Sequence, residues 1–214
     1  MTKICAISDQ HGHVDFKIPS CDLLIIAGDL CPAHDHSTVF QDYWLHNDFF
    51  TWLRQKDYKQ CVFVGGNHDF ALEQNRLRRD KFRRIRAYYI QDEWIELFGI
   101  KIYGTPWQLP FFDWAFNKPE EELVEIYKKI PNELDILISH GPPFQCLDKT
   151  IEGIFAGSKS LRKAIEDRQI KHCFTGHIHE QGSKQDLIRQ TKVYNCSLLD
   201  EKYNMINQPF IIEI

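Results

Sequence analysis

Five short apolar stretches of this chain each end in polar side chains of the kinds that bind metal ions. The motifs at these ends read D-x-H, G-D, G-N-H-D, a single His and G-H-x-H, in that order. Their candidate ligands are two aspartates, one asparagine and four histidines: Asp9, His11, Asp29, Asn67, His140, His177 and His179. This mixture of donors favours Mn, Fe or Zn over Mg or Ca, which prefer oxygen alone. We therefore expect two divalent metal ions, manganese first among the candidates, with open positions for water and phosphate.

The spacing within the motifs favours shared sites. Asp9 and His11 flank one residue, so at an extended strand end both side chains can face the same side, and the H-x-H motif repeats this alternation. Asp29 follows Gly28, where the missing side chain lets the backbone bend closely around a metal. One such fragment means little, and G-N-H-D can be an ordinary turn. Five fragments in this order, each after an apolar run, together predict a metal site.

The apolar runs before these motifs are continuous rather than alternating, which is typical of strands buried on both faces of an α/β sheet. They begin at Ile4, Leu23, Cys61, Leu134 and His172. Trp94–Tyr103 is predicted to be a hairpin that turns near Gly99, and residues 190–214 to hold two or three further strands. Since ligands of open α/β sheets bind at the carboxyl ends of the strands, this layout alone predicts a site there.

Three helices are predicted between the strands. Val39–Gln55 has aromatic residues and leucines at helical spacing. Pro119–Ile130 begins with proline and acidic residues and ends with lysines, an order that suits the helix macrodipole. Ser158–Gln169 is the third, with Ser158 or Ser160 as its N-cap.

The length and charge of the chain limit the kinds of partner that it is expected to bind. Its 214 residues suit one domain, which we expect to span residues 1–214, and 26 basic against 30 acidic residues give a net charge of −4. A mildly acidic chain gains no general attraction to nucleic acid or anionic membranes, so neither is an expected partner. The first residues lack the apolar stretch and the small-residue cleavage site of a signal peptide, so none is expected, and no window approaches about 20 apolar residues. The seven cysteines form no C-x-x-C pair, which favours free thiols and a cytoplasmic location.

The order of the five motifs resembles that of the calcineurin-like metallophosphoesterase superfamily. The resemblance implies an α/β fold, a four-layer sandwich of two mixed β-sheets flanked by helices, with the site along one edge. It implies a first metal held by two aspartates and two histidines: Asp9, His11, Asp29 and His179. It implies a second metal held by one aspartate, one asparagine and two histidines: Asp29, Asn67, His140 and His177. Asp29 would bridge the two metals.

A closer resemblance runs over nearly the whole chain. It is to the small metallophosphoesterase-domain-containing phosphodiesterases, known from animal brain proteins and bacterial relatives. The stretches that carry it are Gly104-Thr-Pro-Trp-Gln, Asp113-Trp-Ala-Phe-Asn, Ser139-His-Gly-Pro-Pro, Gly176-His-Ile-His-Glu and Asn195-Cys-Ser-Leu-Leu-Asp-Glu. One departure is Gln10, where a smaller polar residue such as Thr is expected.

These resemblances imply hydrolysis of a small or nucleotide-like phosphodiester by a metal-bridging hydroxide that displaces the leaving group in line. His68, outside the metal shell and facing the phosphate, would protonate the leaving alkoxide. Asp69 has two interpretations of equal weight, orienting the His68 imidazole or stabilising a turn.

Two other functions stay open at this point. One is a phosphomonoesterase or protein phosphatase with the same metals. The other is a metal-binding scaffold of low activity that keeps the fold and uses its surface for partners. The presence of every expected ligand and of His68 weighs against the scaffold, and the acidic balance weighs against a nuclease.

Three further groups of residues belong to no motif. The aromatic run holds Trp107, Phe111, Phe112, Trp114 and Phe116, and a small core beneath a loop is favoured over a wall that stacks a nucleobase. The basic run from Arg76 to Arg86 is interpreted as a solvated helix face, with steering of the substrate as the alternative. Surface or packing roles are expected for the remaining histidines considered, His34, His36, His46 and His172.

Overall fold

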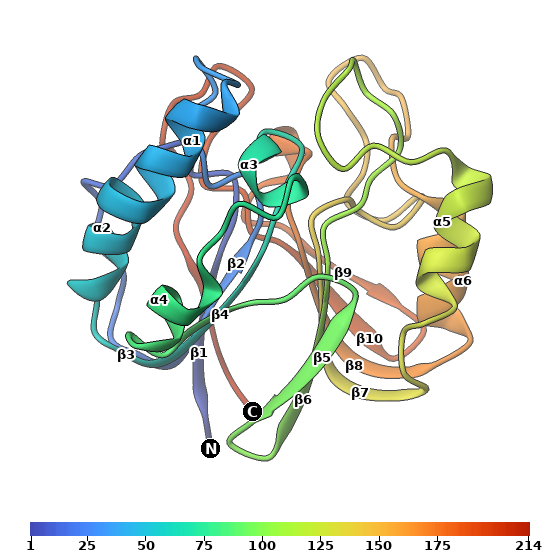
Figure 1. Ribbon diagram of the computed structural model, residues 1–214. Helices are drawn as coiled ribbons and strands as arrows, with labels where there is room; N and C mark the ends of the chain where they lie inside the picture. The colour runs from blue at the N-terminus through green and yellow to red at the C-terminus, as the bar shows by residue number, and fades with distance from the viewer.

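The computed structural model describes residues 1–214 and contains two mixed β-sheets with helices on both outer sides (Figure 1). The first sheet has five strands in the order β11-β1-β2-β3-β4. Their bounds are β1 Lys3–Ile7, β2 Cys21–Ala27, β3 Tyr58–Val64, β4 Ala87–Tyr89 and β11 Phe210–Glu213. Strands β1 to β4 run parallel to one another, and β11 pairs antiparallel with β1.

The second sheet has six strands in the order β5-β6-β7-β8-β10-β9. Their bounds are β5 Glu93–Leu97, β6 Ile100–Thr105, β7 Glu133–Ser139, β8 Gln169–Thr175, β9 Gln185–Ile188 and β10 Thr191–Asn195. The four central strands are parallel, while β5 and β9 close the two edges antiparallel. Both sheets are therefore mixed, as expected.

Helices cover the outer face of each sheet (Figure 1). Those on the first sheet are α1 Thr38–Trp44, the π-helical segment η1 Leu45–Phe49, α2 Phe50–Arg54, α3 Phe70–Glu73 and α4 Arg79–Arg83. Those on the second sheet are α5 Glu120–Tyr127 and α6 Lys159–Glu166, and a short 3₁₀ turn, η2 His179–Gln181, follows β8. Separate apolar cores lie between the two sheets and beneath each helical layer. The four-layer sandwich is confirmed.

Most of the predicted elements are present, with local differences. The helix predicted over Val39–Gln55 is one continuous helical path, but its middle turn is π-helical. The hairpin turns at Phe98-Gly99, where both residues have positive φ, and Ser158 accepts a hydrogen bond from Leu161 N as the N-cap of α6. Residues 190–214 hold two strands, β10 and β11. The short strands β4 and β9 were not predicted.

The topology brings the carboxyl ends of the parallel strands in both sheets to one edge of the sandwich. Residues directly after β1 and β10 join the two sheets there, because Ser8 N donates to Cys196 O at 2.8 Å and Leu198 N to Ser8 O at 3.0 Å. Loops that follow β1, β2, β3, β7 and β8 can therefore meet across the seam between the sheets. None of the helices has the length and apolar character that crossing a bilayer would require.

Candidate metal centre

The predicted ligands come from both sheets and from the loop directly after each strand. In chain order they are Asp9 and His11 after β1, Asp29 after β2, Asn67 after β3, His140 after β7, and His177 and His179 after β8. Each of the seven has a side-chain nitrogen or oxygen within 3.5 Å of such an atom of another. The structure thus gathers all of them in one buried cluster.

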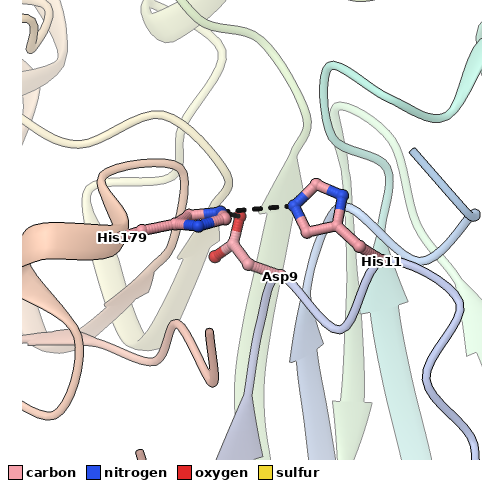
Figure 2. Close-up of side chains that lie close together, drawn as sticks. All are labelled: Asp9, His11 and His179. Carbon is pink, nitrogen blue, oxygen red and sulfur yellow. Dashed lines mark hydrogen bonds and ion pairs between the residues drawn. The ribbon is translucent and has the colours of Figure 1, made fainter. Parts of the chain in front are cut away.

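The first group of donors is formed by Asp9, His11 and His179 (Figure 2). The Nε2 atoms of His11 and His179 face each other at 3.2 Å, and His179 Nε2 lies 3.5 Å from Asp9 Oδ1. The Asp9 carboxylate is held from behind by Ser197 Oγ, which donates at 2.7 Å, and by His177 N. These contacts fix the direction in which the three donors point.

The second group is built around the side-chain amide of Asn67. Its Oδ1 lies 2.8 Å from His140 Nε2 and 2.6 Å from His177 Nδ1. A neutral oxygen between two imidazoles keeps the negative charge of this group low, as expected from its amide. Asn67 itself is 1% exposed and His140 fully buried, so water does not compete freely for these atoms.

Asp29 lies between the two groups. Its Oδ2 is 3.5 Å from His11 Nε2 in the first group and 3.5 Å from His140 Nε2 in the second. Its Oδ1 accepts a hydrogen bond from His68 N at 2.8 Å, which sets the plane of the carboxylate. A carboxylate shared in this way has the position that a bridging ligand requires.

The ring orientations match those of metal-binding histidines. His140 Nδ1 lies 2.9 Å from Ala27 O, and His179 Nδ1 lies 2.9 Å from Asp200 O. A ring that donates its Nδ1–H to a carbonyl leaves the Nε2 lone pair free for a metal. His11 Nδ1 is buried without any hydrogen-bond partner. The donor set therefore fits divalent cations.

The electrostatics of the cluster also favour a cation. Burial raises the pKa of Asp29 well above its usual value, and the nearby Asp9 and Asp69 carboxylates add to this. Burial lowers the pKa of His177 to about 3, so this ring is neutral and offers a lone pair at pH 7. Burial also opposes the charged form of His179, but the Asp9 carboxylate outweighs it and raises the pKa to about 9. Without a cation, the cluster relies on a proton at His179 to balance Asp9.

Strained backbone marks the same residues. Four of the predicted ligands have a left-handed backbone, with φ of 53° at Asp9, 42° at His11, 53° at Asp29 and 68° at His177. Such conformations cost on the order of 1–3 kcal/mol each outside glycine. Gly28, with φ of 98°, is required for a second reason, because a Cβ atom there would lie 2.5 Å from His140 Nδ1. The backbone at Gly28 thus approaches a candidate ligand side chain closely, while its expected bend around a metal stays a prediction.

Asp69 does not contact the His68 imidazole. Its buried carboxylate accepts hydrogen bonds from Leu30 N, Cys31 N and Gly66 N, at 2.8–3.2 Å. It therefore ties the loop after β3 to the loop after β2 beneath the ligands. Of the two interpretations of Asp69, orientation of the His68 ring is wrong, and the stabilisation of a turn is the role its contacts support.

His36, rather than the expected Asp69, lies beside the His68 ring. His36 Nε2 lies 2.9 Å from His68 Nδ1, and the Trp114 ring packs on His68 with centroids 4.3 Å apart. Burial, together with the nearby His36, lowers the pKa of His68 to about 3. His36 was expected to have only a surface or packing role, and no spacing pattern could have found it, since 32 residues separate it from His68.

A cavity of about 680 Å³ opens over Asp29, Asn67, His68 and His177. Three residues of the aromatic run line this cavity: Phe111, Phe112 and Trp114. The other two, Trp107 and Phe116, pack in the apolar core beneath the helices of the first sheet. The small core that was favoured thus accounts for two of the five residues, and the aromatic wall for three. A larger cavity of about 850 Å³ lies at the amino ends of β7, β8 and β10, where none of the predicted ligands reaches it.

The other residues without a motif lie away from the cluster. His34 is exposed, His46 Nε2 accepts a hydrogen bond from Arg78 N at 2.9 Å, and His172 lies against Tyr194, as expected of surface and packing residues. The basic run is mostly solvent-exposed, but only Arg79–Arg83 of it is helical. The expectation of a solvated face is confirmed, and that of a helix over the whole run is wrong.

Comparison with known proteins gives a family and several relatives. The sequence pattern of the family described as calcineurin-like phosphoesterase matches residues 3–181, a range that includes all seven candidate ligands. The human protein named metallophosphoesterase domain-containing protein 1 is 29% identical, over 100% of this chain and 71% of its own. A UPF0046 protein of Caenorhabditis elegans is 30% identical, over 92% of this chain and 56% of its own. An uncharacterised protein of Methanocaldococcus jannaschii is 30% identical, over 95% of this chain and 94% of its own.

Two solved structures share the fold. One is similar with a TM-score of 0.71 at 16% sequence identity, over 99% of this chain and 98% of that chain. The other, the phosphopantetheinyl hydrolase of Mycobacterium tuberculosis, has a TM-score of 0.58 at 14% identity, over 94% of this chain and 90% of that chain. At such low identities the similarity concerns the arrangement of the two sheets and their helices.

Proposed function

Because the chain belongs to the calcineurin-like phosphoesterase family, we propose that it is a two-metal phosphodiesterase that hydrolyses a small phosphate diester. The observation that carries the proposal is the position of Asp29, whose Oδ2 is equally distant, at 3.5 Å, from a ring nitrogen of each donor group. One carboxylate shared by two sets of nitrogen and oxygen donors is what a pair of divalent ions requires.

The two sites would share Asp29 and otherwise use separate ligands. Asp9, His11 and His179 would complete the first site, and Asn67, His140 and His177 the second. Two divalent cations, when bound, supply positive charge to the phosphate oxygens and lower the pKa of water. Manganese is the metal we propose first, with iron or zinc as the alternatives that the same donors accept.

His68 would supply the proton for the leaving group. The reaction joins a water oxygen to phosphorus and breaks the ester P–O bond, so the departing alkoxide needs one proton. His68 Nδ1 faces His36, which leaves Nε2 for the substrate. The pKa of about 3 belongs to the free site, and a phosphate anion beside the ring would raise it because opposite charge favours the protonated imidazole. His36 would hold the ring in the orientation that this transfer needs.

A diester is proposed rather than a monoester because of the charges around the cavity. No Lys or Arg lines it, so only the metals and the imidazoles would be available to balance phosphate charge. A diester carries one negative charge near pH 7, whereas a monoester carries close to two. The phosphatase alternative would have to bind its second charge without any of the arginines that commonly clamp phosphate.

The remaining parts of the proposal concern the chain as a whole. Residues 1–214 would act as one unit, a view supported by the contribution of both sheets to one cluster. A cytoplasmic location is supported by seven buried cysteines, all of them free thiols. A small substrate is supported by the size of the cavity, about 680 Å³.

The test is hydrolysis of bis(p-nitrophenyl) phosphate beside p-nitrophenyl phosphate, with protein stripped of metal and then supplied with Mn²⁺. We expect turnover of the diester that depends on Mn²⁺, with the monoester slower. Asp29→Asn should abolish it, and Asp80→Asn, an exposed carboxylate on α4, is the matched control. Turnover of the monoester alone would replace the proposal by a phosphatase. No turnover of either ester, in protein that holds two metals, would leave the scaffold interpretation.

A further inference from the structure

The cavity above the ligands has an apolar wall on the side of His68. Trp114 packs on the His68 ring, and Phe111 and Phe112 pack on Trp114 with centroids 5.2 and 5.1 Å apart. Phe111 also lies edge-on to His177, with ring centroids 6.5 Å apart, and the two phenylalanines are open to solvent, Phe111 being 50% and Phe112 72% exposed. Because His68 is the proposed proton donor, this wall lies where the leaving group of the substrate would stand.

A second apolar segment faces the same cavity from another loop. Ile151 and Ile154, in the loop after β7, line it and are 74% and 57% exposed. Large apolar side chains gathered on both loops around one cavity are unusual on a protein surface and mark a place where something apolar binds. Because these isoleucines are more than half exposed, packing in an apolar core does not account for them.

The charges at the mouth of the cavity have one sign. Glu152, Glu180 and Glu201 line it, and no Lys or Arg does. Of the lysines near these glutamates in sequence, Lys149 has its Nζ 5.8 Å from the Phe155 ring, Lys184 Nζ donates to Glu180 O at 2.8 Å, and Lys202 directly follows Glu201, but none of the three lines the cavity. A second anionic group on a substrate would therefore meet repulsion without a compensating cation.

We propose that the cavity selects a phosphodiester whose leaving group is flat and apolar and carries no negative charge of its own. This inference rests on the proposed function, because it takes the metal cluster as the site of the phosphate. Aromatic side chains stack on flat groups with little regard to their exact identity, which gives a preference for a class of leaving group rather than one compound. The acidic mouth then excludes nucleoside diphosphates and other esters with an additional anionic group.

The test compares analogues of three diesters, dimethyl, methyl phenyl and methyl 4-carboxyphenyl phosphate, in which a methylene group replaces the oxygen of the leaving group, so that this bond cannot be hydrolysed. Their dissociation constants for the Mn²⁺-loaded protein are measured by calorimetry, which does not depend on turnover. We expect the analogue of methyl phenyl phosphate to bind about tenfold more tightly than that of dimethyl phosphate, because only it reaches the aromatic wall. The carboxyphenyl ester should bind about tenfold more weakly than the phenyl ester.

Variants assign these differences to the residues named. Phe112→Ala should reduce the advantage of the phenyl ester over the dimethyl ester about fivefold, whereas Phe98→Ala, an exposed aromatic on the β5–β6 hairpin, should leave that ratio unchanged. Glu152→Gln together with Glu201→Gln should recover about fivefold for the carboxyphenyl ester. Both positions are exposed, so the variants should fold.

The outcomes separate this inference from the proposed function. If bis(p-nitrophenyl) phosphate is hydrolysed but the three analogues bind equally, or bind undetectably, the leaving-group preference is refuted and the phosphodiesterase stands. If the phenyl ester binds best but no ester is hydrolysed, the selective cavity is supported and the proposed function fails. If the carboxyphenyl ester binds more tightly than the phenyl ester, the acidic mouth does not exclude a second negative charge, and the inference is overturned.

Discussion

The floor and the rim of the cavity are built in opposite ways. The floor consists of the seven candidate metal ligands, which follow buried strands, and their side chains are tied to one another and to backbone carbonyls. The rim consists of long loops after β6 and β7, in which four apolar side chains are half or more exposed: Phe111, Phe112, Ile151 and Ile154. The floor uses strained backbone at four ligands, held in place by two sheets. The difference suggests that the chemistry depends on rigid strand ends, whereas substrate choice depends on loops that can change without disturbing it.

Of the substitutions in the floor, Asp29→Asn should lower activity the most. The amide keeps the shape but removes the shared negative charge, so the loss should reach several kcal/mol, or about 10³-fold in kcat/KM for the diester. Measurement of kcat/KM at saturating Mn²⁺ checks this, with Asp80→Asn as control. A loss below tenfold would mean that Asp29 does not hold both metals.

His68→Ala should lower kcat about 10²-fold for a diester with a poor leaving group, because that group then leaves without a proton. For p-nitrophenolate, a good leaving group, the loss should be much smaller. The comparison of the two esters, with His34→Ala as an exposed control, distinguishes proton donation from binding. Equal losses for both esters would contradict the assigned role.

Protonation of the floor histidines should change the stability of the metal-free protein, whereas the exposed apolar side chains of the rim do not titrate. In metal-free protein the pKa of His177 is about 3, below its unfolded value of about 6.5, so its stabilising contribution is present above pH 6.5 and is lost as the pH falls towards 3. The pKa of His179 is about 9, so its contribution is present below 6.5 and is lost as the pH rises through 9. The combined contribution of these two rings should therefore be greatest near pH 6.5, and protonation linked to the His177 ring alone should lower the free energy of unfolding by about 2 kcal/mol at pH 5.

Denaturant unfolding of the metal-free protein from pH 4.5 to 9.5 measures this profile. Mn²⁺ should flatten its alkaline limb, because a metal replaces the proton at His179. A metal-free profile that rises steadily across the range would refute the opposite protonation of the two rings.

His36→Ala should have the smallest effect on the floor. The ring only holds His68, so kcat should fall about tenfold while KM stays nearly constant, by analogy with residues that orient metal ligands. His36→Asn or His36→Gln should recover part of the loss if an amide can reach Nδ1 of His68. A change in KM without a change in kcat would mean that His36 belongs to the rim instead.

The floor was largely predictable from the sequence because each part of it is local. A continuous apolar run forms a buried parallel strand, and the residue after it must lie at the carboxyl edge. Five such runs therefore place their terminal residues together, whatever the details of the loops. The gathering of the seven candidate ligands follows from this, whereas the two mixed sheets and the assignment of these residues to two metals came from the resemblance to a family.

The rest could not be predicted because it depends on long-range contacts. Asp69 adjoins His68 in sequence, yet the turn after β3 directs its carboxylate to the amides of Leu30 and Cys31. His36 reaches His68 only because the loop before α1 crosses the same edge. The aromatic run has no period, so nothing in it separates Phe116 in the core from Phe112 on the rim. The π-helical turn η1 likewise carried no sequence signal.

Binding of Mn²⁺ to metal-stripped protein tests the central claim most directly. Calorimetry and elemental analysis should give two ions per chain for the wild type, and Asp29→Asn should weaken both sites together, since its carboxylate lies 3.5 Å from a ring of each donor group. A single ion per chain in the wild type would contradict the account. So would two ions of which Asp29→Asn weakens only one.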